Sequence, residues 1–305
     1  MLSFILKRLL IIIPMALLVV TLTWGLIRLA PGTFYSSEKK LPPAIEENIK
    51  KRYGLDKPWY TQYGLVMLNI VKGDFGESLK YQGQSVNEII KRHLPYSATI
   101  GLLAYLLALF IGLSAGIIAA LKQNTIWDHG SMALAMLGLS VPNFVLGPTL
   151  VLIFALGLYW VPPARWGGIS NLILPVITLA AVYAAYIARL TRAGMLEVLR
   201  SDYIRTARAK GLDEKTVLLK HALRGGIIPV VSFTGPALAG LLAGTVVVER
   251  VFSIPGLGNI FIQAVLNRDE PLVLGIVAFL SILIMIFNLA VDISYGFLDP
   301  RIRYD

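Results

Sequence analysis

Ser201-Asp-Tyr-Ile-Arg-Thr-Ala-Arg-Ala-Lys-Gly-Leu-Asp213 is a polar interruption in a chain that is otherwise mostly apolar. Its first two residues can each cap a short helix, because their side chains accept hydrogen bonds from amides that the first helical turn leaves unpaired. Gly211 supplies the left-handed residue that commonly ends such a helix. Asp213 can cap a second helix from Glu214 to Leu223, which Gly225-Gly226 then ends. The sequence therefore predicts two short helices joined at a glycine, a defined bend and not a slack linker.

The segment around this motif, residues 192–226, is called the elbow below, and it carries an excess of cations. Its basic residues are Arg192, Arg200, Arg205, Arg208, Lys210, Lys215, Lys220 and Arg224, against Glu197, Asp202, Asp213 and Glu214. The positive-inside rule places such a segment in the cytoplasm. Tyr203, Ile204 and Ala207 lie among the cations. Residues of these types are usually buried, so their presence here indicates a surface to which a partner protein binds. The alternative is a loop without a binding role, whose lysines and arginines only reflect its location, since cytoplasmic loops are generally rich in both residues.

The composition of the 305-residue chain is that of a membrane protein. Hydrophobic residues make up 56% of it and charged residues 15%, whereas soluble domains have about 25% charged residues. Apolar runs of about twenty residues are long enough to cross roughly 30 Å of hydrocarbon. We expect an all-α polytopic membrane protein with both termini cytoplasmic and six transmembrane helices, at Leu9–Leu29, Tyr96–Leu121, Ser131–Tyr159, Leu172–Leu190, Ile227–Val248 and Leu272–Tyr295. The first is interpreted as an uncleaved span and not as a signal peptide.

The longest connection, residues 32–95, follows the first span and is predicted to form a structured outer lobe. Within it, Pro43–Tyr53 has helical spacing, Trp59–Val71 is an amphipathic helix, Gly73–Ser78 is a turn and Val86–His93 is a short helix. Loops longer than about sixty residues are translocated largely regardless of charge, so the cations of this lobe do not conflict with an outer location.

Prolines and glycines shape two of the spans. Pro142 and Pro148 each remove an amide donor inside the third span, so we expect that helix to be kinked or broken. Gly240 and Gly244 permit a close helix approach in the fifth span, either within the chain or at a dimer interface. Glu249–Pro271 is an outer loop, and Asp299–Arg303 belongs to a charged inner tail.

Several classes of function are excluded by what the chain lacks. No Gly-Lys pair occurs, so there is no phosphate-cradling ATPase loop. There is no cysteine, and His93, His129 and His221 lie in separate segments, so we expect no metal site. The cations lie between and beside the spans, where topology and anionic lipid headgroups account for them without nucleic acid. We expect no enzymatic activity and no cofactor in this chain.

Charged residues near span ends deserve separate consideration, because an ionisable group in hydrocarbon is costly and often functional. They are Arg28, Arg189, Glu249 and Asp292, with Asn288 one helical turn before Asp292. Long side chains at span ends can reach the interface, which is the simpler explanation. No carboxylate lies near a span centre, and this argues against a proton- or sodium-coupled carrier.

The elbow resembles the cytoplasmic motif of ATP-binding-cassette (ABC) importer permeases, Glu-Ala-Ala-x3-Gly-x9-Ile-x-Leu-Pro. Aligned on Gly211, the chain has Arg205-Thr-Ala207 and His221-Ala-Leu-Arg224, so the glutamate, the isoleucine and the proline are replaced. These departures are usual in the oligopeptide and dipeptide permease branch, which the chain resembles over essentially its whole length. Further matches are Arg28-Leu-Ala-Pro-Gly32, Tyr53-Gly-Leu-Asp56 with Gln62-Tyr63, Gly73-Asp-Phe-Gly76, Ala120-Leu-Lys-Gln-Asn-Thr125, Phe252-Ser-Ile-Pro-Gly-Leu-Gly258 and Asp299-Pro-Arg-Ile-Arg-Tyr304. The length is similar to that of the first permease subunit of an oligopeptide importer.

This resemblance implies a type I ABC importer fold in a bacterial or archaeal plasma membrane. It implies a homologous second permease, two ATPase subunits that bind ATP and magnesium, an extracytoplasmic peptide-binding protein and a peptide substrate. The elbow would be the coupling helix seated in an ATPase, and Glu249 and Arg250 would lie near the outer mouth. The implied ATPase-coupling residues are Asp202, Tyr203, Ile204, Arg205, Thr206, Ala207, Arg208, Lys210, Gly211, Leu212 and His221, and the pathway or gate candidates are Glu249, Arg250, Asn288 and Asp292.

Three other functions remain open at this stage. Nickel, glutathione or oligosaccharides are alternative substrates within the same family, since selection rests largely with the binding protein. An ion-coupled carrier predicts transport by the purified chain without ATPases. A purely structural membrane protein predicts that changes in the elbow alter folding but not flux.

Overall fold

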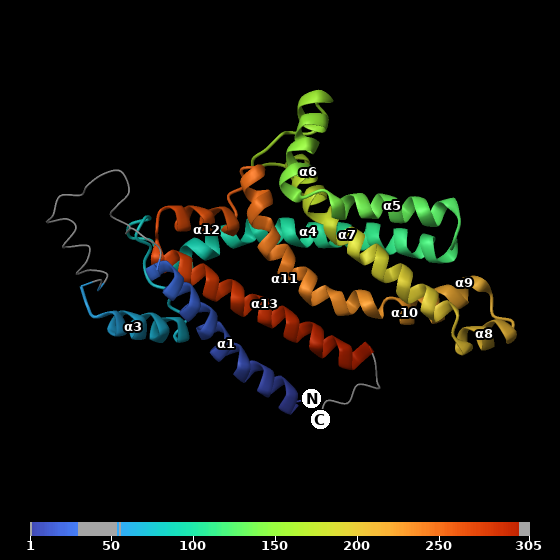
Figure 1. The fold of residues 1–305 in the computed structure, drawn as a ribbon, viewed down its shortest axis with the longest axis horizontal. Helices are drawn as coiled ribbons and strands as arrows, with labels where there is room; N and C mark the ends of the chain where they lie inside the picture. The colour runs from blue at the N-terminus through green and yellow to red at the C-terminus, as the bar shows by residue number, and fades with distance from the viewer. Residues whose placement is uncertain (1, 30–53, 55, 299–305) are drawn as a thin grey trace. The chain divides into compact units, whose positions relative to one another are not determined.

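The computed structural model of the protein describes residues 2–29, 54 and 56–298 (Figure 1). Within these ranges the regular structure is helical, apart from one isolated antiparallel bridge between Glu77 and Ser85. The five longest helices are α1 (Leu2–Leu29), α4 (Val86–Leu121), α7 (Ile169–Leu199), α11 (Ile228–Val251) and α13 (Glu270–Leu298).

Four helices in the described ranges are long and apolar enough to cross a membrane, namely α1, α4, α7 and α13. Two bent pairs raise the number to six if each pair is one span. The first pair joins α5 (Ile126–Ser140) to α6 (Asn143–Leu150) and its π-helical continuation η2 (Val151–Gly157) through a bend of 104°. In the second pair, the segment Glu214–Gly226 leads into α11 through a bend of 46°. The predicted six-span, all-helical architecture is consistent with this arrangement.

The break in the third span falls at Pro142, as the sequence predicts. Val141 is extended, because the proline ring disfavours a helical conformation for the residue before it, and Pro142 is extended as well. Pro148, by contrast, lies inside α6 and does not interrupt it. The helix continues from there into the π-helical turns of η2, whose backbone bonds join residues five apart and not four apart as in an α-helix.

The chain divides into two compact units, one formed by Met1–Pro95 with Gly256–Ile286 and the other by Tyr96–Pro255 with Phe287–Asp305. The first unit contains α1, α3 (Trp59–Val71), the first turns of α4, α12 (Leu257–Leu266) and most of α13. Its largest core is made where one face of α4 meets α12 and α13. The buried residues there are Val86, Ile89, Ile90, Leu257, Ile260, Ala264, Leu272, Val273 and Ile276.

A buried carboxylate fixes the turn-rich segment of the first unit. Asp269 has no exposed surface and accepts hydrogen bonds from the Ser78 hydroxyl at 2.5 Å and from the amides of Leu79 and Lys80 at 3.1 Å. It also accepts from the amide of Leu272 at 3.3 Å, so it serves as the N-cap of α13. The hairpin before α4 is thereby tied to the loop between α12 and α13.

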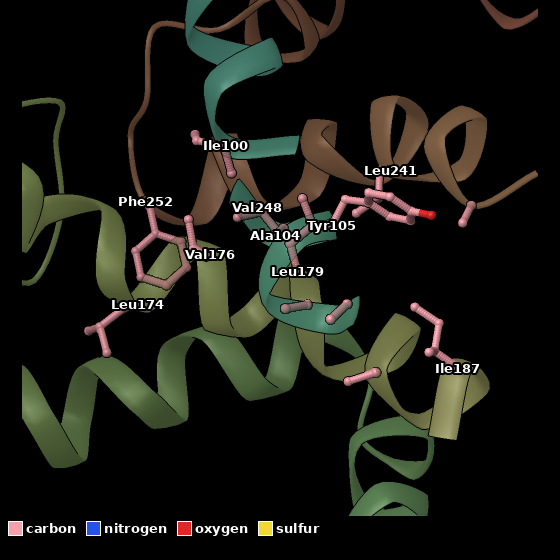
Figure 2. Packing of buried hydrophobic residues seen from close by; sticks show 14 of the residues in the cluster. Ile100, Ala104, Tyr105, Leu174, Val176, Leu179, Ile187, Leu241, Val248 and Phe252 are labelled. Atoms are coloured by element: carbon pink, nitrogen blue, oxygen red, sulfur yellow. The ribbon is translucent and has the colours of Figure 1, made fainter. Parts of the chain in front are cut away.

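The second unit is organised around α7, which packs against α5, α6 and α11. Its core, shown in Figure 2, combines Ile100 and Ala104 of α4 with Leu179 of α7, Val248 of α11 and Phe252. Gly240 of α11 faces Tyr183 of α7, whose hydroxyl would lie 2.5 Å from an added Cβ atom. The glycine thus serves helix packing within the chain, one of the two uses that its spacing suggests.

Several helix boundaries differ from those expected. α7 continues to Leu199, well past the predicted end at Leu190, so the first residues of the elbow are the last turns of a span. α4 begins at Val86 and merges the predicted short helix with the second span. Helix α12 was not expected, because Leu257–Leu266 is too short to be recognised among loop residues. Pro43–Tyr53 and Asp299–Arg303 lie outside the described residues.

Candidate functional site

The elbow contains the expected pair of helices joined at a glycine. The first is α8 (Asp202–Ala209), and Gly211 follows with a φ of +80°. The amide of Gly211 bonds to the carbonyl of Arg208 at 2.9 Å and that of Leu212 to the carbonyl of Ala207 at 3.4 Å, the pattern of a Schellman C-cap. A side chain larger than hydrogen is strained at this φ, so glycine is required here.

The second arm of the elbow is one continuous helical run. It comprises α9 (Glu214–Thr216), the π-helical η3 (Val217–Ala222) and α10 (Leu223–Gly226). Asp213 caps this run, since its Oδ2 accepts from the Thr216 amide at 3.0 Å. Hydrogen bonds from the side chain and backbone of Thr216 lower the pKa of Asp213 below its ordinary value. Ser201, by contrast, donates its hydroxyl to the carbonyl of Val198 at 2.6 Å and makes no side-chain cap.

An ion pair clasps the two arms of the elbow together. The guanidinium of Arg208 on α8 donates to both carboxylate oxygens of Glu214, at 3.1 and 2.6 Å. This hydrogen bonding raises the pKa of Arg208. Both side chains are exposed, so the pair adds little free energy, but its two-pronged geometry restrains the angle between the arms.

The inner face of the elbow is packed against the chain itself. Ile204 and Ala207 of α8 are buried and form a cluster with Ala120, Met195 and Val217. The sequence suggests a partner surface for these apolar residues, but their side chains are used for internal packing. This fixes the elbow to the ends of α4 and α7 and leaves the opposite face of α8 outermost.

The outer face of α8 is polar and exposed. Because Ile204 and Ala207 point inward, the helical period places Asp202, Arg205, Thr206 and Ala209 on the other side. Arg205 and Asp202 form an ion pair there. Of the other predicted coupling residues, Tyr203, Arg208, Lys210, Gly211 and Leu212 are exposed, whereas His221 is partly buried on the second arm. Ala209 was not among the residues singled out from the sequence.

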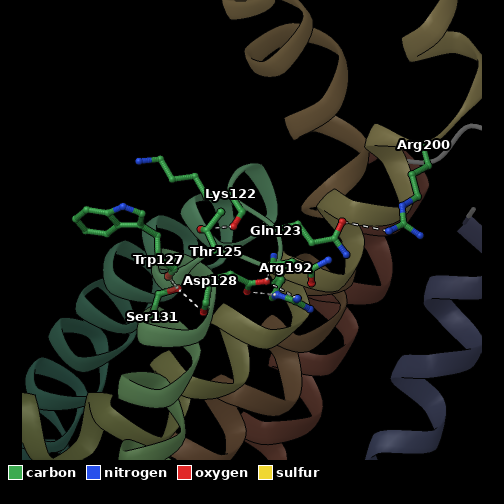
Figure 3. Close-up of polar contacts among 9 residues, drawn as sticks. Lys122, Gln123, Thr125, Trp127, Asp128, Ser131, Arg192 and Arg200 are labelled. Carbon is green, nitrogen blue, oxygen red and sulfur yellow. Dashed lines mark hydrogen bonds and ion pairs between the residues drawn. The ribbon is translucent and has the colours of Figure 1, made fainter.

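A buried ion pair lies where the elbow begins, on the last turns of α7 (Figure 3). The guanidinium of Arg192 on α7 donates through Nε to Oδ1 of Asp128 at 2.6 Å and through Nη2 to Oδ2 at 2.7 Å. The amide of Asn124 also donates to Oδ2, at 3.0 Å. The side chain of Asp128 is only 2% exposed, whereas that of Arg192 is 29% exposed. The pair joins the start of α5 to α7, a contact that no local sequence signal reveals.

The end of α4 and the short segment that follows it are held to α7 at two further places. Arg200 donates to the side-chain carbonyl of Gln123 at 3.1 Å, as Figure 3 shows. Gly116 on α4 lies so close to α7 that an added Cβ would be 2.5 Å from Cβ of Thr191 and 2.6 Å from the carbonyl oxygen of Ala188. The cytoplasmic ends of α4, α5 and α7, on the predicted topology, therefore form one tightly joined base for the elbow.

An open apolar groove of about 450 Å³ lies between this base and the second arm of the elbow. Its surface is made almost entirely by apolar atoms of side chains from α4, α7 and the second arm of the elbow. Its lining residues are Ile117, Leu121, Met195, Glu214, Lys215, Leu218, Leu219 and Leu223. The groove has no arrangement of polar groups that would orient a small polar ligand.

The four pathway or gate candidates are not brought together. Glu249 is fully buried near the end of α11 and accepts a hydrogen bond from the Ser97 hydroxyl of α4 at 2.6 Å, while Arg250 beside it is exposed. Asn288 instead lies by Gly235, near the start of α11, and Asp292 is partly buried one turn further along α13. Gly235 and Glu249 are about 21 Å apart along a helix. These residues therefore form two separate polar sites, one toward each end of α11.

Comparison with known proteins places these features in a family. The model of a family described as binding-protein-dependent transport system inner membrane component matches residues 112–304. The chain is 46% identical to the oligopeptide transport system permease protein OppB of Haemophilus influenzae, with all of both chains covered. It is 40% identical to the dipeptide transport system permease protein DppB of Bacillus subtilis, over 99% of this chain and 98% of that one.

A solved structure supports the fold. An inward-facing conformation of the MetNI methionine ABC transporter matches with a TM-score of 0.59 at 17% identity, covering 69% of this chain and 96% of that chain. The likeness concerns the fold alone at this identity. The type I ABC importer fold and the location as a multi-pass protein of the plasma membrane, both predicted from the sequence, are confirmed.

Proposed function

The chain belongs to the family of binding-protein-dependent transport system inner membrane components, and we propose that it is a permease subunit of an ATP-driven importer of oligopeptides or dipeptides. Relatives similar over the full length are named for the transport of these two substrates. A homologous second permease completes the translocation path, and two ATPase subunits supply the energy by binding ATP and magnesium. An extracytoplasmic binding protein delivers the peptide.

The elbow is the part of this chain that binds the ATPases and is moved by their change in conformation. Its outer face, formed by Asp202, Arg205, Thr206 and Ala209, docks into an ATPase, while its inner face stays packed on the permease. A displacement of the ATPase then moves the whole elbow, because glycine geometry, the Asp213 cap and the Arg208–Glu214 pair restrain its shape. A slack loop would absorb the same displacement.

The contacts behind the elbow give the movement a path into the membrane. Ile204 and Ala207 press on Met195 of α7, and α7 is joined to α5 through Arg192 and Asp128. The second arm continues through a 46° bend into α11. Movement of the elbow therefore turns α5, α7 and α11 as packed bodies, the rigid-body mode that packed interfaces favour.

A rigid elbow with its polar face outward is the single observation that carries the coupling role. Its test is the substitution Ala209→Arg, which adds bulk to the outer face without touching the packed inner face. We expect the variant to insert normally but to lose co-purification with the ATPase subunits or ATP-driven peptide uptake in vesicles. Ala207→Arg, by contrast, would place a charge in the buried cluster and disrupt the elbow itself.

The matched control is Ala209→Ser, which keeps the residue small and should leave both association and uptake unchanged. Normal ATPase association and normal uptake by Ala209→Arg would contradict docking through this face. Competition of labelled peptide uptake by nickel, glutathione or an oligosaccharide separates the alternative substrates of the family. We expect competition by unlabelled peptides only.

A further inference from the structure

Helix α3 is free of charge along its whole length, although it lies in the connection predicted to form a structured outer lobe. Its thirteen residues run from Trp59 to Val71 between Lys57 and Lys72. At 1.5 Å per residue it is about 20 Å long, too short to span a membrane. Uncharged helices of this length are typical of buried cores or of interfacial and re-entrant segments.

The ends of the neighbouring spans give a depth scale for α3. Between Arg8 and Arg28 helix α1 has no charged residue, and this stretch matches the hydrocarbon thickness of about 30 Å. Arg28 therefore marks one edge of the hydrocarbon. It donates to Glu270 at 3.2 Å, at the start of α13, and to Gln62 of α3 at 2.5 Å. The three helices share this level.

From that level α3 runs down beside α1 into the hydrocarbon zone. The Tyr63 hydroxyl bonds to that of Thr21 at 2.8 Å, and Thr21 lies seven residues, or about 10 Å, below Arg28. Further along α3, Ile70 packs with Val20 of α1 and with Ala278 of α13, which is about 12 Å past Glu270. Two spans thus independently give a similar depth for the end of α3.

The face of α3 turned away from these spans is apolar and open. Leu65, Leu68 and Val71 are 41%, 50% and 59% exposed, at a helical spacing that puts them on one side. On α1, the exposed residues Leu22 and Leu26 lie at the same depth, so the apolar surface of the span continues at this level. Trp59 and Tyr60 begin α3 near Trp24, as expected of aromatic residues at a membrane interface.

We propose that α3 is a re-entrant helix inserted into one leaflet of the membrane, with the Leu65, Leu68 and Val71 face covered by phospholipid acyl chains. Trp59 and Tyr60 then lie at headgroup level, and Lys72 extends its amine along the helix end toward polar groups. The first unit is thereby anchored in lipid beside its spans. This inference is independent of the substrate and of the ATPase contact.

The chain has no cysteine, so single spin labels can test the proposal directly. Leu68→Cys is labelled in the full-length protein, in the complex with which it purifies, after reconstitution into phospholipid nanodiscs. Leu22→Cys on α1 is the lipid-facing control and Lys57→Cys, just before α3, is the water-facing control. Collision rates of each label with oxygen, which enters hydrocarbon, and with a polar nickel chelate, which does not, are then measured.

We expect Leu68→Cys to collide more often with oxygen than with the nickel chelate, as Leu22→Cys does, and the order to be reversed for Lys57→Cys. A nickel rate at residue 68 equal to that at residue 57 would place the face in water and overturn the proposal. Low rates with both reagents would mean that protein covers the face, for example the second permease, and would overturn it as well. Leu65→Cys should repeat the result of Leu68→Cys.

Discussion

The carboxylate of Asp128 is nearly inaccessible to solvent, and both of its oxygens are satisfied by Arg192 and Asn124. The two ends of the ion pair are not equivalent, because Arg192 retains 29% exposure. Removal of the cation leaves a charge buried without its counterion, whereas removal of the anion leaves a cation that water can still reach. Desolvation, and not attraction between the charges alone, therefore sets the energetic role of each residue.

Arg192→Ala should consequently destabilise the protein by about 3 kcal/mol, a magnitude typical of breaking a buried ion pair. Asp128→Ala should cost less, and the double variant should cost less than Arg192→Ala alone because no buried charge is left unpaired. Denaturation of the detergent-purified protein followed by tryptophan fluorescence measures the three values. Equal costs for the two single variants would contradict the asymmetry in burial.

Part of the elbow could be predicted at this scale and part could not. Gly211 and the Asp213 cap follow from local rules, because a left-handed residue and a side-chain cap involve only near neighbours in sequence. The ion pair of Asp128 and Arg192 joins residues 64 apart, so nothing in either local segment indicates it. Ile204 and Ala207 were recognised as buried types, but the sequence could not say whether their cover is this chain or a partner.

Helix α4 is positioned by close approaches of its glycines to α7 and not by its apolar character alone. At Gly116 a methyl group would meet Thr191 and Ala188 at 2.5 and 2.6 Å, whereas at Gly101 of the same helix an added Cβ has nothing within 4 Å. The two glycines thus differ in function although they share a helix. Of these two glycines, only Gly116 lies at the close contact between α4 and α7.

Gly116→Ala should therefore destabilise the protein by about 1–3 kcal/mol, the usual cost of overpacking. Gly101→Ala is the matched control and should be neutral or stabilising by up to about 1 kcal/mol, since alanine favours helix over glycine. Thermal unfolding of both variants in the same detergent measures the difference. Equal midpoints would show that α4 can move away from α7 without cost.

Helices could be predicted from the sequence where their length and hydropathy determine them. They could not be predicted where their boundaries or existence depend on tertiary contacts. The spans and the break at Pro142 follow from apolar run length and a missing amide. The extension of α7 to Leu199 depends on the ion pair and packing that bury its last turns, and these compensate for its polar residues. Helix α12 is stabilised by burial of Leu257 and Ile260 against α4 and α13, which a ten-residue window does not reveal.

For the whole molecule, transport driven by separate ATPases and transport by an ion-coupled carrier differ in what the chain needs. The sequence contains no phosphate-binding loop, so on our proposal energy has to enter from outside the chain through the elbow. Vesicles that contain this chain with its second permease and ATPases should take up peptide only with ATP inside. Vesicles with this chain alone should show no uptake under a proton or sodium gradient. Gradient-driven uptake by the isolated chain would contradict the proposed function.

The corner between α5 and α6 restricts what can surround the chain. Helix ends leave four carbonyls and four amides without intrahelical partners, and acyl chains offer no hydrogen bonds to replace them. The corner follows the fifteen residues of α5, about 22 Å along its axis, and Ser140 and Pro142 are exposed on this chain by itself. Acyl chains alone therefore cannot surround the corner. The unpaired backbone groups have to be hydrogen-bonded either by water from the transport pathway or by polar groups of another subunit.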